Sequence, residues 1–215
     1  SELLEVLGGV RPATGTLSVR DVPLPLDGPG ADGRARRGAG VAHVPEDRQR
    51  DGLIMDYTAW ENMIFGYHGD QGTIMKNAQI QAESQASMDR FDVRPPNARL
   101  AAKNFSGGNQ QKIVLAREIE RNPNILLIGQ PTRGVDIGAI EFIHKQIIAL
   151  RDAGKAILLV SVELDEIMAL SDRIAVMFDG QIMGERKPTE TDETELGLMM
   201  AGIAAGTRSP EAAHG

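Results

Sequence analysis

Three stretches of the sequence decide the fold: Phe105-Ser-Gly-Gly-Asn-Gln-Gln-Lys112, then the apolar run Ile125-Leu-Leu-Ile128, then Gly129-Gln-Pro-Thr-Arg-Gly-Val-Asp136. Two glycines just before a helical pattern let the backbone approach a phosphate closely. The helix start adds free N–H groups and the positive end of the helix dipole. An isolated Ser-Gly-Gly is an ordinary capped loop, so the informative feature is the order of loop, helix, buried strand and polar turn.

This order resembles the signature motif, Walker B strand and D-loop of ATP-binding cassette (ABC) proteins. The resemblance is closest to the second nucleotide-binding domain of tandem ABC ATPases in ribose, galactose and purine-nucleoside importers. Further matching segments cover nearly the whole chain: Val44–Arg48, Asp51–Leu53, Glu61-Asn62, Val160-Ser161, Glu163–Glu166, Ser171–Arg173, Val176-Met177 and Leu198–Gly202. The resemblance implies an α/β fold, a P-loop NTPase-like ABC cassette with a parallel sheet core and an inserted helical subdomain.

The resemblance also implies functions for individual residues. Five of them would contact the γ-phosphate of an ATP held by the opposing cassette: Ser106, Gly107, Gly108, Asn109 and Gln110. Glu46 falls on the Q-loop, which senses nucleotide and couples to the membrane subunit, and Asp136 falls on the D-loop at the dimer interface. The implied cofactors are ATP and Mg²⁺. The implied partners are a second cassette and integral membrane permease subunits, at the cytoplasmic face of the plasma membrane.

The sequence departs from the family pattern where the family places Asp-Glu before Pro-Thr, because this chain has Gly129-Gln130. Gly129 has no side chain to hold a magnesium-bound water. Gln130, at the position of the catalytic Glu, can orient a water but cannot take its proton, and loss of a general base costs roughly 10²–10⁴-fold in rate. The switch histidine falls on Val162. We therefore expect a weak or inactive hydrolytic site.

The phosphate-cradling loop, Gly-x-x-x-x-Gly-Lys-[Ser/Thr], is absent from this sequence. In the family a sequence like Ser-Glu-Leu directly follows the glycines of that loop. Ser1 is then expected at the magnesium-binding hydroxyl, with the Walker A loop and first strands missing. The alternative for Ser1 is a disordered terminus.

Composition narrows the functional class. The 215 residues are 41% hydrophobic and 25% charged, and no apolar stretch is long enough to span a bilayer. A net charge of −7 argues against a nucleic-acid partner. The basic cluster Arg34-Ala-Arg36-Arg37 is expected in a solvated loop. The four histidines (His43, His68, His144, His214) have no metal-site spacing, and cysteine is absent. We predict no metal site.

The chain is predicted as one partial nucleotide-binding domain over 1–204, with a helical subdomain at about 57–121 and a disordered tail at 205–215. Strands are predicted at 16–20, 41–44, 125–128, 156–161, 173–178 and 181–185, and 21–40 is expected to be irregular. Helices are predicted at 1–7, 75–91, 109–120, 137–152 and 163–170, and one is predicted to start at the capping box Thr58-Ala-Trp-Glu61. Strands alternating with helices favour βαβ units.

Two other classes stay open beside an importer ATPase half that lends its signature to a partner. One is an interaction module without a nucleotide role that docks on the membrane subunits of a transporter. The other is a soluble ABC protein of translation or repair, which the acidic charge and the importer-type match disfavour.

Overall fold

The computed structural model describes residues 2–71 and 75–203, which fall into two compact units divided between Val160 and Ser161. The first unit begins with α1 (Glu2–Leu7), the hairpin β1 (Leu17–Val19) and β2 (Val22–Leu24), α2 (Gly33–Gly38), β3 (Val41–Val44) and the π-helical turn η1 (Arg48–Gly52). It continues with α3 (Ala59–Ile64), η2 (His68–Gln71), α4 (Asn77–Arg90), η3 (Ala102–Asn104), α5 (Gly107–Ile119), β4 (Ile125–Gly129), α6 (Ile137–Asp152) and β5 (Ala156–Val160).

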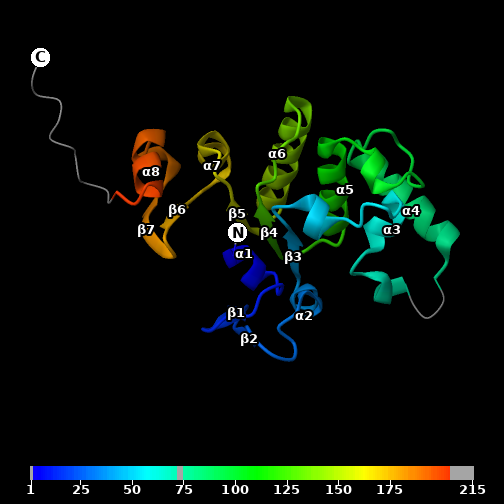
Figure 1. The fold of residues 1–215 in the computed structure, drawn as a ribbon, viewed down its shortest axis with the longest axis horizontal. Helices are drawn as coiled ribbons and strands as arrows, with labels where there is room; N and C mark the ends of the chain where they lie inside the picture. The colour runs from blue at the N-terminus through cyan, green and yellow to red at the C-terminus, as the bar shows by residue number, and fades with distance from the viewer. Residues whose placement is uncertain (1, 72–74, 204–215) are drawn as a thin grey trace, which may run out of the picture. The chain divides into compact units, whose positions relative to one another are not determined.

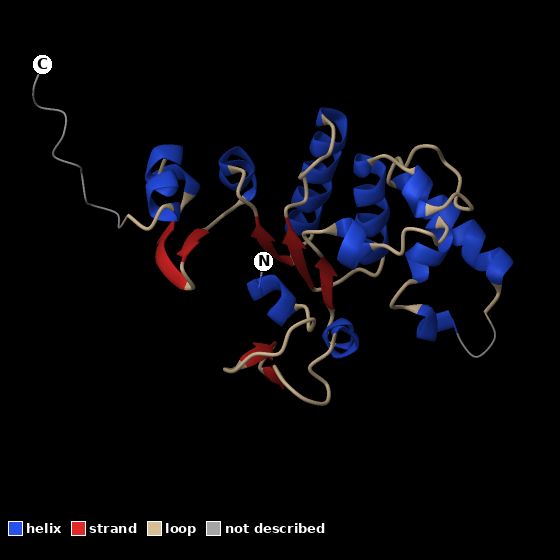
Figure 2. Cartoon of the chain, in the orientation of Figure 1, coloured by secondary structure: helices blue, strands red, loops and turns tan. Residues whose placement is uncertain are grey.

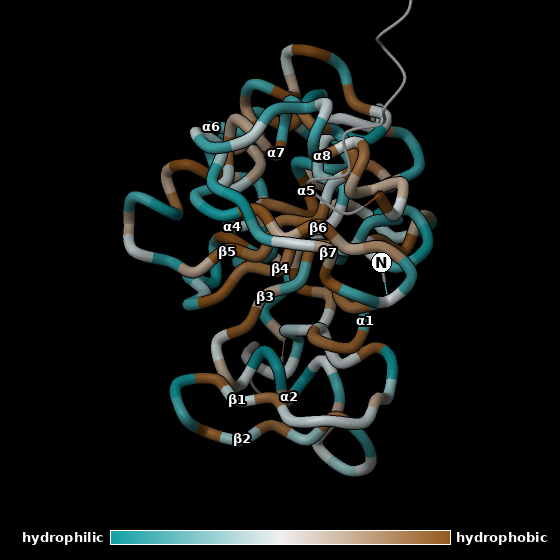
Figure 3. The backbone as a smooth tube through the Cα atoms, turned by 90° about the vertical axis from the view of Figure 1, so that its left-hand side faces the viewer, coloured by the Kyte–Doolittle hydropathy of each residue, from teal (hydrophilic) through white to brown (hydrophobic). Residues whose placement is uncertain are grey.

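A three-stranded parallel sheet in the order β3-β4-β5 forms the centre of this unit. The central strand, β4, is apolar along its length, and Leu126 and Ile128 are fully buried. Parallel strands covered on both faces read as continuous hydrophobic runs, and each buried Leu or Ile contributes roughly 1.5–3 kcal/mol. Figure 3 shows these strands as the brown, hydrophobic part of the unit.

The helical segment from α3 to α5 is inserted between β3 and β4. In Figure 1, α5 stands between the sheet and the pair α3 and α4, and it contacts β3 as well as both helices. The predicted capping box at the start of α3 is confirmed: the Thr58 N–H donates to Glu61 Oε2 at 2.8 Å, and the Glu61 N–H donates to Thr58 Oγ1 at 3.4 Å. Capping fixes where α3 begins.

The second unit has its own small core. It contains α7 (Leu164–Leu170), the antiparallel hairpin of β6 (Ile174–Phe178) and β7 (Gln181–Arg186), η4 (Pro188–Glu190) and α8 (Glu193–Met200), which Figure 2 distinguishes by colour. Ile174, Val176, Leu196 and Met199 are buried together. The predicted Asp179-Gly180 turn is confirmed, and both residues have the positive φ that this hairpin turn requires.

Two sequence-based expectations were wrong. The 21–40 stretch is not irregular, since it contains β2 and α2, and Asp32 caps α2 by accepting the Ala35 N–H at 2.8 Å. The arginine cluster is not a solvated loop. Arg36 is buried and donates to the Leu7 carbonyl at 3.1 Å and the Pro25 carbonyl at 2.6 Å. Arg37 stacks over the Tyr67 ring at 5.2 Å.

Candidate functional site

The carboxyl ends of β3 and β4 meet at one edge of the parallel sheet. Val44 pairs with Ile128, so the segment starting at Pro45-Glu46 and the segment starting at Gln130 leave the sheet side by side. Ligands of open parallel sheets bind at this edge. The sheet therefore brings the predicted residues Glu46, Gln130 and Asp136 to one region, on the segments that follow the two strands.

Among the side chains that the structure describes, none caps the first backbone N–H groups of α5. Ser106 is the N-cap in an extended conformation, but its hydroxyl makes no capping bond to the helix. That hydroxyl instead accepts a hydrogen bond from Asn109 Nδ2 at 2.9 Å, and Asn109 Oδ1 accepts the Arg94 N–H at 2.6 Å. Asn109 thus ties the preceding turn to α5 while the helix N-terminus stays suited to an external anion.

Both signature glycines lie in places that a side chain would fill. A Cβ on Gly107 would lie 2.5 Å from an Arg48 guanidinium nitrogen and 2.8 Å from the Gly134 carbonyl oxygen. A Cβ on Gly108 would lie 2.9 Å from Asp136 Oδ2 and 3.0 Å from the Ala139 Cβ. The start of α5 therefore packs directly against the loop that follows β4.

Asp136 is the N-cap of α6, and its Oδ1 accepts the Ala139 N–H at 3.0 Å. Ser106, Gly107, Gly108, Asn109 and Asp136 are thus brought together. Gln110 faces the protein interior, with 3% exposure. Its amide nitrogen donates to the Ala102 and Phe105 carbonyls at 3.2 and 3.0 Å, and its oxygen accepts from Gln49 at 2.9 Å. A nucleotide contact from Gln110 stays a prediction.

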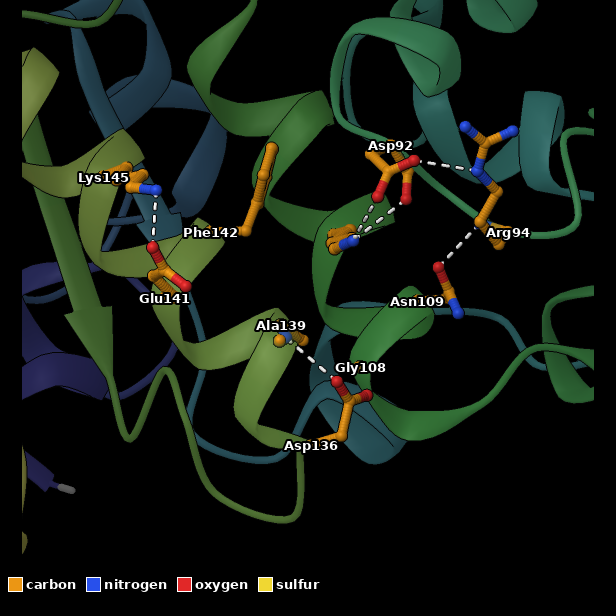
Figure 4. A pocket seen from close by; sticks show the side chains of 11 residues that line it. Asp92, Arg94, Gly108, Asn109, Asp136, Ala139, Glu141, Phe142 and Lys145 are labelled. Carbon is orange, nitrogen blue, oxygen red and sulfur yellow. Dashed lines mark hydrogen bonds and ion pairs between the residues drawn. The ribbon is translucent and has the colours of Figure 1, made fainter.

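A cavity of about 370 Å³ lies beside the signature, between α5, α6 and the turn at 92–94 (Figure 4). Lys112, 7% exposed, donates from Nζ to the Asp92 carbonyl at 2.9 Å and pairs with Asp92 Oδ2 at 3.3 Å. The same ammonium lies 4.8 Å from the centre of the Phe142 ring. Hydrogen bonds from Arg94 and Lys112 hold the pKa of the Asp92 carboxyl below its usual range.

Two side chains of this site were not selected from the sequence as site residues. Lys112 holds the 92–94 turn against α5, and Arg48 binds the loop after β4. The sequence signal for Arg48 was its place just after a buried strand, in Pro45-Glu46-Asp47-Arg48. Nothing local in the sequence indicates its partner, which is distant along the chain.

The end of β4 is packed differently from the start of α5, because its neighbours are mainly apolar. A Cβ on Gly129 would lie 2.8 Å from a Leu4 methyl and 3.3 Å from the Glu46 Cβ and backbone nitrogen. Gln130 is 7% exposed with a φ of 46°, and its backbone N–H donates to the Val160 carbonyl at 2.8 Å. Within the described residues its side-chain amide makes no hydrogen bond. Apolar packing thus fills the space at Gly129, the position where this chain lacks the carboxylate of the family pattern.

A family model of the ABC transporter matches residues 1–133. The chain belongs to the ABC transporter family.

Curated relatives extend the match beyond the family model. The guanosine import ATP-binding protein NupO of Bacillus subtilis is 43% identical over 207 residues, which is 94% of this chain and 40% of NupO. The nucleoside import ATP-binding protein NupA of Lactococcus lactis is 49% identical over 75% of this chain and 33% of NupA. The ribose import ATP-binding protein RbsA of Yersinia pestis is 32% identical over 94% of this chain and 40% of RbsA. The chain thus spans about 40% or less of their length.

Solved ABC cassettes share the fold. A nucleotide-free ATP-binding cassette from an ABC transporter superposes with a TM-score of 0.72, at 19% identity, over 94% of this chain and 80% of that one. The dimeric cassette MJ0796 bound to ADP and phosphate has a TM-score of 0.69, at 23% identity, over 87% of this chain and 79% of that one. The predicted α/β cassette with a parallel sheet is confirmed.

The other positions predicted from the sequence add little to this site. Ser1 lies outside the described residues, as do His214 and the predicted tail at 205–215. Val162 is 60% exposed in the second unit. Among residues 2–71 and 75–203, the His, Asp and Glu side chains form no metal-binding group. In the same described ranges, no helix is long and apolar enough to cross a membrane.

Proposed function

We propose that this chain is the second cassette of an importer ATPase for a nucleoside or a sugar, and that it lends its signature to an ATP held by a partner cassette. The import functions of NupO for guanosine, NupA for nucleosides and RbsA for ribose support the substrate class. The start of α5 supports the role, because Ser106 makes no capping bond to the helix and the Gly107 and Gly108 N–H groups lie in its first turn, where an anion is favoured.

The observation that carries this proposal is the contrast between the two ends of the site. At α5 the glycines pack closely against an arginine guanidinium, a backbone carbonyl and a carboxylate, with the Ala139 Cβ beside Gly108. At β4 the same type of residue, Gly129, is covered by Leu4 and Glu46. A cassette built this way contributes binding to a neighbour's nucleotide and little hydrolysis of its own.

The residues at the end of β4 do not fit Mg²⁺. Gly129 offers no ligand, and Gln130 offers an amide instead of a carboxylate. The nearby Glu46 carboxylate lies 3.4 Å from the Arg133 guanidinium. Magnesium prefers carboxylate and water ligands in octahedral geometry. The proposed partner cassette therefore supplies the metal-binding carboxylates. Closure of the two cassettes would be transmitted to permease subunits at the inner face of the plasma membrane.

The test is a matched pair of glycine substitutions in the full-length ATPase assembled with its permease. Gly107→Ala forces the Arg48 guanidinium or the Gly134 carbonyl away from α5, whereas Gly38→Ala meets no atom within 4 Å. We expect Gly107→Ala to lower ATP-driven uptake by about 10²-fold, the loss seen when one transition-state donor is displaced. Gly38→Ala is expected to leave uptake unchanged.

Full uptake by the Gly107→Ala protein would instead favour an interaction module that docks on the permease without a nucleotide role. A second readout uses the chain alone. Micromolar binding of Mg-ATP with steady hydrolysis by the isolated chain would contradict the inactive site that we propose at Gly129-Gln130.

A further inference from the structure

We propose that Arg48 is a positioning residue that holds the loop 131–136 at a fixed spacing from the signature. This inference rests on the proposed signature function, but its structural part can be tested separately. Arg48 comes four residues after the end of β3, and the loop that it contacts follows β4. The side chain therefore connects the segments that leave two neighbouring strands.

The contacts of the guanidinium are made to backbone. Arg48 Nη1 donates to the Arg133 carbonyl at 2.7 Å, and Nη2 donates to the Gly134 carbonyl at 3.2 Å. The same Nη2 occupies the space where a Gly107 Cβ would lie, 2.5 Å away. One planar group thus touches both the loop after β4 and the first turn of α5.

The backbone that presents Arg48 is itself fixed. Asp47 caps the π-helical turn, and its Oδ1 accepts the Gln49 and Arg50 N–H groups at 3.0 and 3.1 Å. On the other side, Glu46 forms an ion pair with Arg133 at 3.4 Å. Glu46 and Arg48 therefore both hold the 133–134 turn. Glu46 pairs with the Arg133 side chain, and Arg48 binds the carbonyls of Arg133 and Gly134.

A guanidinium suits this position for a geometric reason. Its planar fork donates to two adjacent carbonyls at once, which a lysine ammonium on a flexible stem does not reproduce. Partial burial lowers the pKa of the Arg48 guanidinium against the attraction of Asp47 and with the repulsion of Arg133, and an arginine stays charged at any pH of interest. Arg48 therefore acts on Gly107 through packing and on the loop through hydrogen bonds.

The experiment compares Arg48→Lys, Arg48→Gln and the control Arg50→Gln in the full-length ATPase. Arg50 is two residues away, 69% exposed, and pairs only with Asp51 among the described contacts. Hydrogen exchange is measured over 131–136, and ATP turnover is measured as kcat and KM. We expect both Arg48 variants to speed exchange of the loop and lower kcat, each about tenfold, the scale of one lost charged hydrogen bond. KM for ATP stays unchanged, and Arg50→Gln behaves as wild type.

Three results would overturn the assignment. If Lys restores turnover while Gln raises KM for ATP, Arg48 contacts the nucleotide by charge. If exchange over 131–136 is unchanged in both variants, Arg48 does not hold the loop. If exchange speeds up while kcat stays normal, and Gly107→Ala still abolishes uptake, the loop spacing does not matter to the signature. Normal uptake with Gly107→Ala would instead mean that the proposed function itself has failed.

Discussion

Gly107 and Gly108 at the start of α5 lie mainly against polar groups, a guanidinium, a carbonyl and a carboxylate, with the Ala139 Cβ beside Gly108. Gly129 at the end of β4 lies closest to a Leu4 methyl, with the Glu46 Cβ and backbone nitrogen farther away. All three glycines allow close approach, but what approaches them differs. Polar neighbours at α5 keep the backbone oriented for a charged ligand from outside. Apolar neighbours at β4 close the space with the protein's own core. Close packing at a motif glycine therefore indicates a binding function only when the surrounding chemistry suits the ligand.

The largest effect on stability is expected from Gly108→Ala. Its Cβ would press on the Asp136 carboxylate and on the Ala139 Cβ, both at the fixed start of α6. Neither can move without shifting the helix, so the free energy of unfolding should fall by about 2–3 kcal/mol, the upper range for overpacking. Urea denaturation of the purified chain measures it. A loss below about 0.5 kcal/mol would mean that α5 and α6 are not tightly packed here.

A smaller effect is expected from Gly129→Ala, because the nearest atom is the end of a flexible side chain. The Leu4 methyl can shift within the core that buries it, so the loss should be about 1–2 kcal/mol, below that of Gly108→Ala. The ATP-driven uptake of the full-length protein should not change, in contrast to Gly107→Ala. A sharper form replaces Gly129 by Asp and Gln130 by Glu. If that double variant gains ATP hydrolysis that depends on the new carboxylates, the end of β4 is not closed as we describe.

The smallest effect concerns His43, on β3 near the Leu4 side of the sheet. Burial lowers the pKa of His43 from its usual value, against the attraction of Glu118, Asp51 and Glu5 and with the help of Arg117. The unfolded chain takes up a proton near pH 6.5 and the folded chain resists it, so stability is lost as pH falls below about 6.5. Unfolding free energies at pH 7.5 and 5.5 should show this loss.

His43→Gln should reduce that loss between pH 7.5 and 5.5. The exposed His68 provides the matched control, and His68→Gln should leave the pH dependence intact. If both variants behave alike, the apolar side of the sheet is better hydrated than its packing implies.

The sequence predicted the elements whose signals are local. The apolar run 125–128, the capping box at Thr58 and the helix over 137–152 all appear where their patterns place them. It missed α2, because glycine and arginine obscure a six-residue helix that tertiary contacts of Arg36 stabilise. It also missed α8, where no start signal was recognised although Asp192 caps the helix.

At the site, the motif residues were recognisable, but their surroundings were not. Ser106 to Asn109 and Asp136 come together as their spacing suggests. The closure of Gly129 depends on Leu4 at the other end of the unit, and the grip of Arg48 on residues 133–134 depends on how two parallel strands align. Such long-range contacts leave no local pattern.

The outer position of β5 has a consequence for the behaviour of the chain in concentrated solution. Its residues Ala156 to Val160 are all apolar and only partly covered, and in the described part of the chain β4 is the one strand that pairs with it. Unpaired N–H and C=O groups along an apolar strand are a template for adding another chain. A lysine in place of Ala156, the exposed residue of β5, should therefore raise the concentration at which the chain begins to self-associate.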